Sequence, residues 1–208
     1  VLFKVWAPHA VEVSVVGDFN DWDRAAHPLT REGDVWFGVV NEARTGSEYQ
    51  FCLKTADAEF LRNDPVAFAL TNSVGNGIVI DHDDFDWGND DTFSLAPWNE
   101  LVIYELHLGT YFRGEDKETV GTFDDAIARL GHLVSLGINA IELMPISEFA
   151  GGISWGYNPA YPYAVESDYG GVEGFKRFVN AAHSHGIAVI LDVVYNHFGP
   201  SDLDLWQF

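Results

Sequence analysis

The sequence predicts a multidomain protein in which an all-β domain precedes the first units of a parallel βα domain. Up to about residue 80, short segments alternate apolar and polar residues, which is the period of half-buried strands. After Pro97, nearly continuous apolar strands alternate with segments of helical periodicity, the pattern of parallel βαβ units. With 208 residues, of which 47% are hydrophobic, the chain can form a packed core in each part.

The first 80 residues contain strand and turn signals without helical periodicity. Residues 11–15, 35–39 and 49–53 alternate as strands do, and segments rich in Gly, Asp and Asn separate them. Several short strands at this spacing predict a small antiparallel β-sandwich over residues 1–80. Cys52 lies within a strand pattern, so we expect a small buried hydrophobe, and a single cysteine excludes an internal disulfide.

Residues 81–97 have the composition of an acidic interdomain linker. The segment 81–91 holds six Asp and no Lys or Arg, so self-repulsion makes it a poor core element. Phe85 and Trp87 are expected to pin it to a neighbouring surface. A calcium loop is the alternative, but the spacing lacks the Gly and the closing Glu of such a site.

Residues 98–208 are predicted to form three parallel strands joined by two helices. The strands are expected at 101–108, 138–144 and 187–194, with a long irregular loop before the second helix. Thr122 is the expected N-cap of the first helix, which continues to Leu136. An open doubly wound sheet and a closed eight-stranded barrel both fit this pattern. Because three strands leave an apolar edge uncovered, we interpret this part as the front of a larger domain.

The net charge of −21, from 11 Lys and Arg against 32 Asp and Glu, is spread over the whole chain. Such a surface repels phosphate backbones and anionic lipids, which disfavours nucleic-acid and membrane partners and favours a neutral, hydroxyl-rich ligand. No apolar run approaches the roughly 18 residues of a membrane helix. With no signal peptide visible, we expect a cytoplasmic protein. The excess of Asp is typical of saline environments, and the sequence does not indicate an oligomeric state.

Polar residues at the ends of the predicted strands are the candidates for a site, because ligands bind at the carboxyl ends of parallel strands. Glu105 and His107 share strand parity and are predicted to form a buried polar pair that supports the site. Asp192 interrupts an apolar strand, so it must be hydrogen bonded. His183 and His185 allow a metal site, but their place at a helix end favours an interaction with the helix dipole.

Several motifs resemble the α-amylase family, glycoside hydrolase family 13. Asp-Val-Val-Tyr-Asn-His at 192–197 resembles its first signature region, and segments 104–110, 143–146, 155–159 and 168–171 resemble its first two barrel units. Residues 5–8 and 17–22 resemble the sandwich modules that precede branching enzymes, debranching enzymes and trehalohydrolases. The resemblance implies an immunoglobulin-like carbohydrate-binding module over 1–80, a linker over 81–97, and the first three units of an incomplete (β/α)8 TIM barrel over 98–208.

The resemblance also implies roles for individual residues. His197 matches the histidine that binds the 6-hydroxyl of the sugar at the cleavage point, and Tyr157 matches the tyrosine that stacks on that sugar. Asp192 matches an aspartate that organises the site. Asn196 matches a calcium ligand of some members, which makes it a weak calcium candidate in a site otherwise expected to lack metals and cofactors. Trp155 is a further supporting candidate in the groove.

The implied function is retaining chemistry on α-1,4-glucans. We expect 1,4-α-glucan branching, with hydrolysis of the trehalohydrolase or debranching type as the alternative. The family's nucleophile and general acid lie on later strands, so we expect this chain alone to lack them and to be inactive. A non-catalytic glucan-binding fragment is the other possibility. Trp22 and Trp36 are then expected either to bind glucan or to pack in the core or between the domains. No Gly-x-Gly-x-x-Gly motif supports a nucleotide enzyme.

Overall fold

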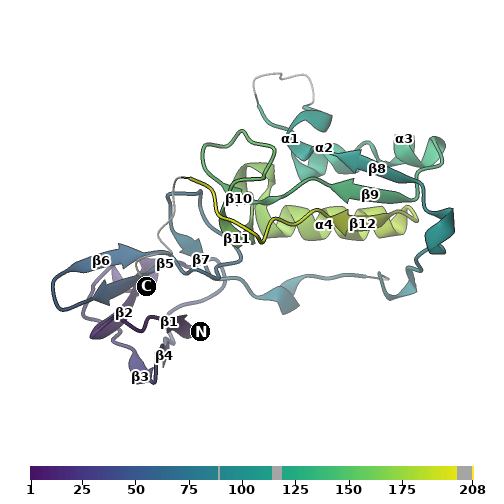
Figure 1. Ribbon diagram of the computed structural model, residues 1–208. Coiled ribbons are helices and arrows are strands. Elements are labelled where there is room, and N and C mark those ends of the chain that lie inside the picture. The colour runs from purple at the N-terminus through teal and green to yellow at the C-terminus, as the bar shows by residue number, and fades with distance from the viewer. Residues whose placement is uncertain (89, 114–118, 201–207) are drawn as a thin grey trace.

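The computed structural model describes residues 1–88, 90–113, 119–200 and 208. The chain forms an N-terminal β-rich part and a second part of parallel strands and helices, joined by a long connection (Figure 1). The helices of the second part gather around strands β8, β9 and β12, whereas β1 to β6 lie at the other end of the molecule.

The N-terminal part consists of two antiparallel sheets that share one core. The first sheet has the order β1-β4-β3, and the second has the order β2-β5-β6 with β7 paired to β5. The predicted strands are confirmed, and their inward side chains, which include Phe3, Val15 and Phe51, form one buried cluster. The strands are β1 (Leu2–Trp6), β2 (Glu12–Gly17), β3 (Thr30–Glu32), β4 (Val35–Val39), β5 (Glu48–Lys54), β6 (Glu59–Arg62) and β7 (Gly77–Ile78).

Trp36 and Cys52 belong to the interior of this part. Trp36 is 6% exposed, and its indole Nε1 donates to the carbonyl oxygen of Ala7 at 3.1 Å. Its packing role is therefore confirmed, and it is not available to grip a ligand. Cys52 is 5% exposed, as expected for a buried hydrophobe. Trp22 is half-buried in the turn after the short η1 (Asp18–Asn20).

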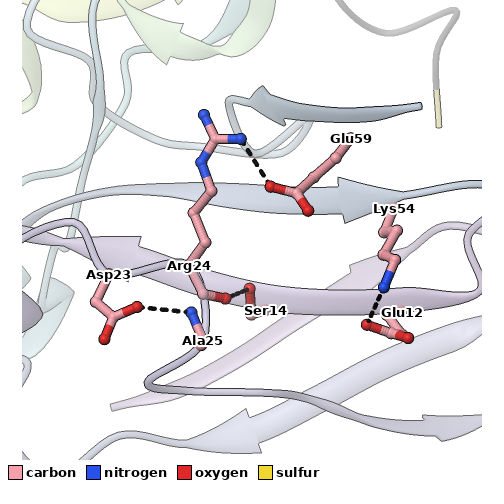
Figure 2. A network of polar contacts seen from close by, with 7 residues as sticks. All are labelled: Glu12, Ser14, Asp23, Arg24, Ala25, Lys54 and Glu59. Carbon is pink, nitrogen blue, oxygen red and sulfur yellow. Dashed lines mark hydrogen bonds and ion pairs between the residues drawn. The ribbon is translucent and has the colours of Figure 1, made fainter.

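A network of ion pairs and hydrogen bonds covers the outer face of the second sheet (Figure 2). Arg24 pairs with Glu59 at 2.7 Å, and Lys54 pairs with its cross-strand neighbour Glu12 at 3.0 Å. The Ser14 hydroxyl donates to the Arg24 carbonyl at 2.6 Å, which holds the loop that contains Arg24 against β2. Exposed pairs of this kind contribute about 0–1 kcal/mol each, so they mainly fix the position of the loop.

The acidic connection is anchored to the long helix α4 (Gly171–Ser184). Phe93 stacks on the imidazole of His183 with ring centroids 4.0 Å apart, and His183 Nδ1 lies 2.6 Å from a carboxylate oxygen of Asp90. The expected pinning is confirmed for Phe85, whose ring lies 5.5 Å from the Lys176 ammonium, whereas Trp87 is 38% exposed and packs against Phe85 itself. The connection, residues 81–97, contains the short 3-10 turns η2 (His82–Asp84) and η3 (Asp90–Thr92), and η4 (Trp98–Glu100) follows it.

The second part is built on a parallel sheet of three strands with the order β12-β9-β8, which confirms the predicted βαβ units. The strands are β8 (Ile103–Leu106), β9 (Ala140–Leu143) and β12 (Ala188–Leu191). One face of this sheet packs against the helices, and Leu106, Ile141 and Leu143 share a buried cluster with Phe123 and Phe178.

The single helix expected from Thr122 to Leu136 is wrong, since the structure has two helices, α2 (Phe123–Ile127) and α3 (Leu130–Ser135). Thr122 does cap the first, in a reciprocal capping box with Asp125. The interruption falls at Arg129, whose backbone φ is −111° and whose guanidinium lies 3.7 Å from the centroid of the Phe112 ring.

The segment expected to be an irregular loop contains an antiparallel hairpin, which corrects that prediction. It is formed by β10 (Ser147–Phe149) and β11 (Pro159–Val165). Pro159 and Pro162 favour a loop in the sequence, because proline cannot donate to a strand ladder. A two-stranded sheet with shifted register tolerates them, and only residues 150–158 remain as the hairpin loop. A short helix, α1 (Leu108–Tyr111), was also missed.

The two parts contact each other along β11. The Asn63 side-chain amide donates to the Tyr161 hydroxyl at 3.3 Å, and the Val165 amide donates to the Phe68 carbonyl at 3.3 Å. A small apolar cluster accompanies these bonds, so the hairpin is held from the N-terminal part as well as from α4. Its members are Ala67, Leu70, Ala160, Tyr161 and Ala164.

Candidate functional site

The candidate site lies at the carboxyl ends of the three parallel strands. Because Leu106 and Leu143 point into the helical core, their neighbours Glu105 and Glu142 point to the opposite face, where the two glutamates are cross-strand partners. The third strand ends at Leu191, so the expected strand to residue 194 is too long. Asp192 is therefore half-buried just beyond the strand, and its amide donates to the Leu143 carbonyl at 2.9 Å.

Tyr157 reaches this edge from the hairpin loop and bonds to Asp192. Its hydroxyl donates to the Asp192 carboxylate at 2.7 Å, while 41% of the residue remains exposed. This hydrogen bond, together with the nearby charges of Asp192, Glu105 and Glu142, raises the pKa of Tyr157 to about 12. The phenol is therefore protonated near neutral pH and acts as the donor to the aspartate.

His197 contacts the same tyrosine through the backbone. Its Nε2 lies 2.8 Å from the Tyr157 carbonyl oxygen, to which it donates, and its Nδ1 lies 2.7 Å from the amide group of Asn196. The structure thus brings together Tyr157, Asp192 and His197, the three predicted substrate-binding residues. Trp155, two residues before Tyr157, is 71% exposed.

The loop that carries Tyr157 has a conformation set by its own sequence. Gly156 has a φ of +85°, and a Cβ at this position would lie 2.1 Å from the Pro145 carbonyl oxygen. Only glycine fits such a left-handed, close-packed position. The Ser154 hydroxyl bonds to Asn158 and accepts from the Gly156 amide at 3.0 Å, which closes the turn around Tyr157.

The predicted buried pair of Glu105 and His107 is wrong. Glu105 is exposed, and His107 bonds elsewhere: its Nε2 lies 2.8 Å from the Ser154 carbonyl oxygen and its Nδ1 lies 2.8 Å from the Thr110 hydroxyl. The strand ends at Leu106, so the alternation that relates Glu105 to His107 no longer applies. His107 therefore contacts the hairpin loop at Ser154 and not Glu105.

Two buried carboxyl groups near the site were missed from the sequence. Glu148 and Glu166 are each 1% exposed, and each accepts a backbone amide beside the other: Glu148 from Ser167 at 2.8 Å and Glu166 from Phe149 at 3.1 Å. Burial, with their mutual repulsion, raises the pKa of Glu148 to about 8, and burial raises that of Glu166 to about 7. The available signal was the position of Glu148 between Ile146 and Phe149, in an apolar segment.

Within residues 1–88, 90–113, 119–200 and 208, no three His, Cys, Asp or Glu side chains are grouped as a metal site. Asn196 as a calcium ligand stays a prediction. In the same part of the chain, no helix is long and apolar enough to cross a membrane.

Two regions of the chain match known families. Residues 1–67 match carbohydrate-binding module 48, the isoamylase N-terminal domain, and residues 107–204 match the alpha amylase catalytic domain. The second region contains His107, Tyr157, Asp192 and His197. Residues 107–204 are therefore assigned to the α-amylase family and residues 1–67 to carbohydrate-binding module 48, as the sequence motifs indicated.

Relatives with two different activities are among the proteins similar to this chain. The chain is 40% identical to the malto-oligosyltrehalose trehalohydrolase of Arthrobacter ramosus, over 99% of this chain and 34% of the relative. It is 37% identical to the 1,4-alpha-glucan branching enzyme GlgB of Picrophilus torridus, over 99% of this chain and 29% of the relative. The chain thus spans about one third of the length of these relatives.

Two solved structures superimpose on nearly the whole chain. A crystal structure of a putative alpha amylase from Salmonella typhimurium superimposes with a TM-score of 0.86 at 34% identity, over 99% of this chain and 33% of that one. A pullulanase from Paenibacillus barengoltzii superimposes with a TM-score of 0.79 at 26% identity, over 95% of this chain and 36% of that one.

Proposed function

We propose that the chain is part of an α-glucan-active enzyme whose activity is 1,4-α-glucan branching. The observation that carries this proposal is the assembly of Tyr157, Asp192 and His197 at the carboxyl ends of the parallel strands, within the region that matches the amylase catalytic domain. The similarity to branching enzymes over nearly the whole chain supports the choice of activity. The proposed substrate is an α-1,4-glucan in the cytoplasm, with no cofactor.

The proposed architecture is an immunoglobulin-like β-sandwich over residues 1–80, a linker over 81–97, and the first three units of a (β/α)8 barrel over 98–208. The shared core of the two N-terminal sheets supports the sandwich. The strands β8, β9 and β12 are neighbours in chain order, as in the first three units of a barrel, and the match of residues 107–204 to the alpha amylase catalytic domain favours the barrel over a doubly wound sheet. Glu105, Glu142 and Asp192 would then face the barrel interior.

In this proposal the exposed ring of Tyr157 forms the platform for one sugar. A phenol ring against the C–H face of a pyranose buries apolar surface and leaves the hydroxyls free. The bond to Asp192 fixes the rotation of the ring. His197, which is exposed, exchanges its Asn196 partner for the 6-hydroxyl of the sugar.

The proposed reaction is retaining and proceeds in two steps. A carboxylate attacks the anomeric carbon while a second carboxyl group protonates the departing glycosidic oxygen, which breaks the α-1,4 bond. The 6-hydroxyl of an acceptor glucan then attacks the glycosyl-enzyme, gives its proton to the second carboxylate, and releases the first. We propose that both carboxyl groups lie outside this chain, so that neither Glu105 nor Asp192 takes these roles and the 208 residues alone are inactive.

Hydrolysis is the second candidate, since the trehalohydrolase of Arthrobacter ramosus is 40% identical. Trehalose would then be the leaving group of the first step, and water would replace the acceptor hydroxyl in the second step to release a maltooligosaccharide. A pullulanase-type debranching reaction differs only in the bond that is cleaved. A fragment that binds glucan without turnover is the remaining alternative.

The test uses the full-length protein that carries this chain, incubated with amylose. Branching predicts loss of iodine colour without a matching rise in reducing ends, together with new α-1,6 linkages. A stoichiometric rise in reducing ends, or release of trehalose from maltooligosyltrehalose, would replace branching by hydrolysis. The 208-residue chain alone is expected to change neither quantity, and turnover by it would contradict the placement of the carboxyl groups.

A further inference from the structure

We propose that His107 is a positioning residue that fixes the hairpin loop 150–158 and, through it, the ring of Tyr157. The inference rests on the proposed function only in giving Tyr157 a role toward sugar. The contacts that carry it lie entirely within the described part of the chain.

The first step is the attachment of the loop to the end of β8. His107 directly follows this strand, and its Nε2 lies 2.8 Å from the Ser154 carbonyl oxygen, although the two residues are 47 positions apart. The other ring nitrogen, Nδ1, lies 2.8 Å from the hydroxyl of Thr110 in α1. One imidazole therefore connects the strand, the first helix and the hairpin loop.

The second step is the tautomer of the His107 imidazole, that is, which ring nitrogen carries the proton. The neutral form with a proton on Nε2 satisfies both neighbours, because Nε2–H donates to the Ser154 carbonyl and Nδ1 accepts from the Thr110 hydroxyl. The hydroxyl of Tyr169, a residue that is 1% exposed, lies 3.2 Å from Nε2 and 3.5 Å from the same carbonyl. The half-buried imidazole thus has its orientation fixed on three sides.

The third step carries this restraint to Tyr157. Ser154 accepts from the Gly156 amide and bonds to Asn158, so the residues on both sides of Tyr157 depend on the position of Ser154. Little apolar burial holds the loop, since Trp155 is 71% and Tyr157 is 41% exposed. Polar contacts therefore decide where the ring lies, and without His107 the Tyr157 hydroxyl is expected to leave Asp192.

Five variants of the 208-residue chain test this inference. His107→Phe removes both ring contacts. His107→Gln keeps an amide N–H donor near the position of Nε2, whereas the shorter side chain of His107→Asn places its amide only near the position of Nδ1. His132→Phe is the matched control, because His132 is an exposed histidine on α3. Asp192→Asn is the positive control, since it removes the charge that accepts the Tyr157 hydrogen bond.

The readout is the pKa of Tyr157, followed by NMR of carbon-13-labelled tyrosine, with the signal assigned through Tyr157→Phe. We expect this pKa to fall from about 12 toward the ordinary value of 10.0 in His107→Phe, His107→Asn and Asp192→Asn. It should stay near about 12 in His107→Gln and His132→Phe. A folded His107→Phe or His107→Asn chain that keeps the raised value would overturn the inference, and His107→Asn serves if His107→Phe does not fold.

The same variants in the full-length protein separate this inference from the proposed function. If both hold, His107→Phe raises KM for maltoheptaose about tenfold, and His107→Gln restores most of the loss. If the tyrosine titration responds but glucan kinetics do not, His107 positions the loop and the role of Tyr157 toward sugar is wrong. If the titration does not respond, the positioning role is wrong whatever the enzyme does.

Discussion

Glycine 156 shows at the residue scale how the sequence directs a functional side chain. Its φ of +85° turns the chain so that Tyr157 points to Asp192, and a Cβ there would lie 2.1 Å from the Pro145 carbonyl oxygen. Gly137 has a similar φ of +81°, yet a Cβ at that position meets nothing within 4 Å. Both positions require a left-handed backbone conformation, and they differ only in the space available for a Cβ atom.

We therefore expect Gly156→Ala to destabilise the chain more than Gly137→Ala. The left-handed conformation alone costs alanine about 1–2 kcal/mol, and the clash with Pro145 should add about 2 kcal/mol more at residue 156. Urea unfolding of both variants measures the free energies of unfolding. Equal losses would mean that the loop relaxes freely and that the close approach to Pro145 is unimportant.

The sequence could predict individual site residues where a motif contains them, but not their partners. Tyr157, Asp192 and His197 follow from the motifs, and the structure does bring them together. The contact of His107 with Ser154 depends on where β8 ends, and a strand boundary that shifts by one or two residues changes the partner completely.

The β10–β11 hairpin is the element that the sequence concealed, because its prolines favour a loop. Its two strands are joined by a reciprocal arrangement in which Glu148 accepts from Ser167 and Glu166 accepts from Phe149. Such pairing between distant positions leaves no periodic signal in the sequence. The parallel strands were predictable for the opposite reason, since each is a continuous apolar run.

This arrangement makes the stability of the element depend on pH. The pKa values of Glu148 and Glu166 rise to about 8 and about 7 in the folded chain, from 4.5. Between pH 4.5 and pH 8 the folded state therefore binds more protons than the unfolded state. The stabilisation that these protonated carboxyl groups give the folded chain is complete below about pH 4.5 and is lost as the pH rises to about 8.

Glu148→Gln keeps a neutral acceptor and should reduce the loss of stability between pH 5 and pH 8 by about 2 kcal/mol. Glu32→Gln is the control, because Glu32 is exposed on β3. Urea unfolding at the two pH values gives the comparison. The same pH dependence in wild type and Glu148→Gln would show that the buried carboxyl does not hold its proton.

The acidic surface belongs to the whole molecule. Its net charge of −21 is shared by both parts, with 6 Lys and Arg against 17 Asp and Glu up to residue 97 and 5 against 15 after it. Repulsion of this extent opposes the compact state, and salt screens it as the Debye length falls from about 10 Å at 0.1 M to about 3 Å at 1 M.

We expect the melting temperature to rise as KCl is added from 0.1 M to 1 M, in agreement with the predicted saline habitat. Differential scanning calorimetry at constant pH measures it. A melting temperature that is constant or falls would show that the acidic surface has no such role in stability.

The measurement that tests the account most directly is kcat/KM on amylose for Tyr157→Ala in the full-length protein. Trp98→Ala is the control. Trp98 is also exposed, at 78%, but it precedes β8 and so lies toward the amino ends of the parallel strands, whereas Tyr157 lies at their carboxyl ends. The account predicts at least about a tenfold loss for Tyr157→Ala, equivalent to about 1.4 kcal/mol, and none for Trp98→Ala. Equal activity of Tyr157→Ala and the wild type would contradict the assignment of this edge as the glucan site.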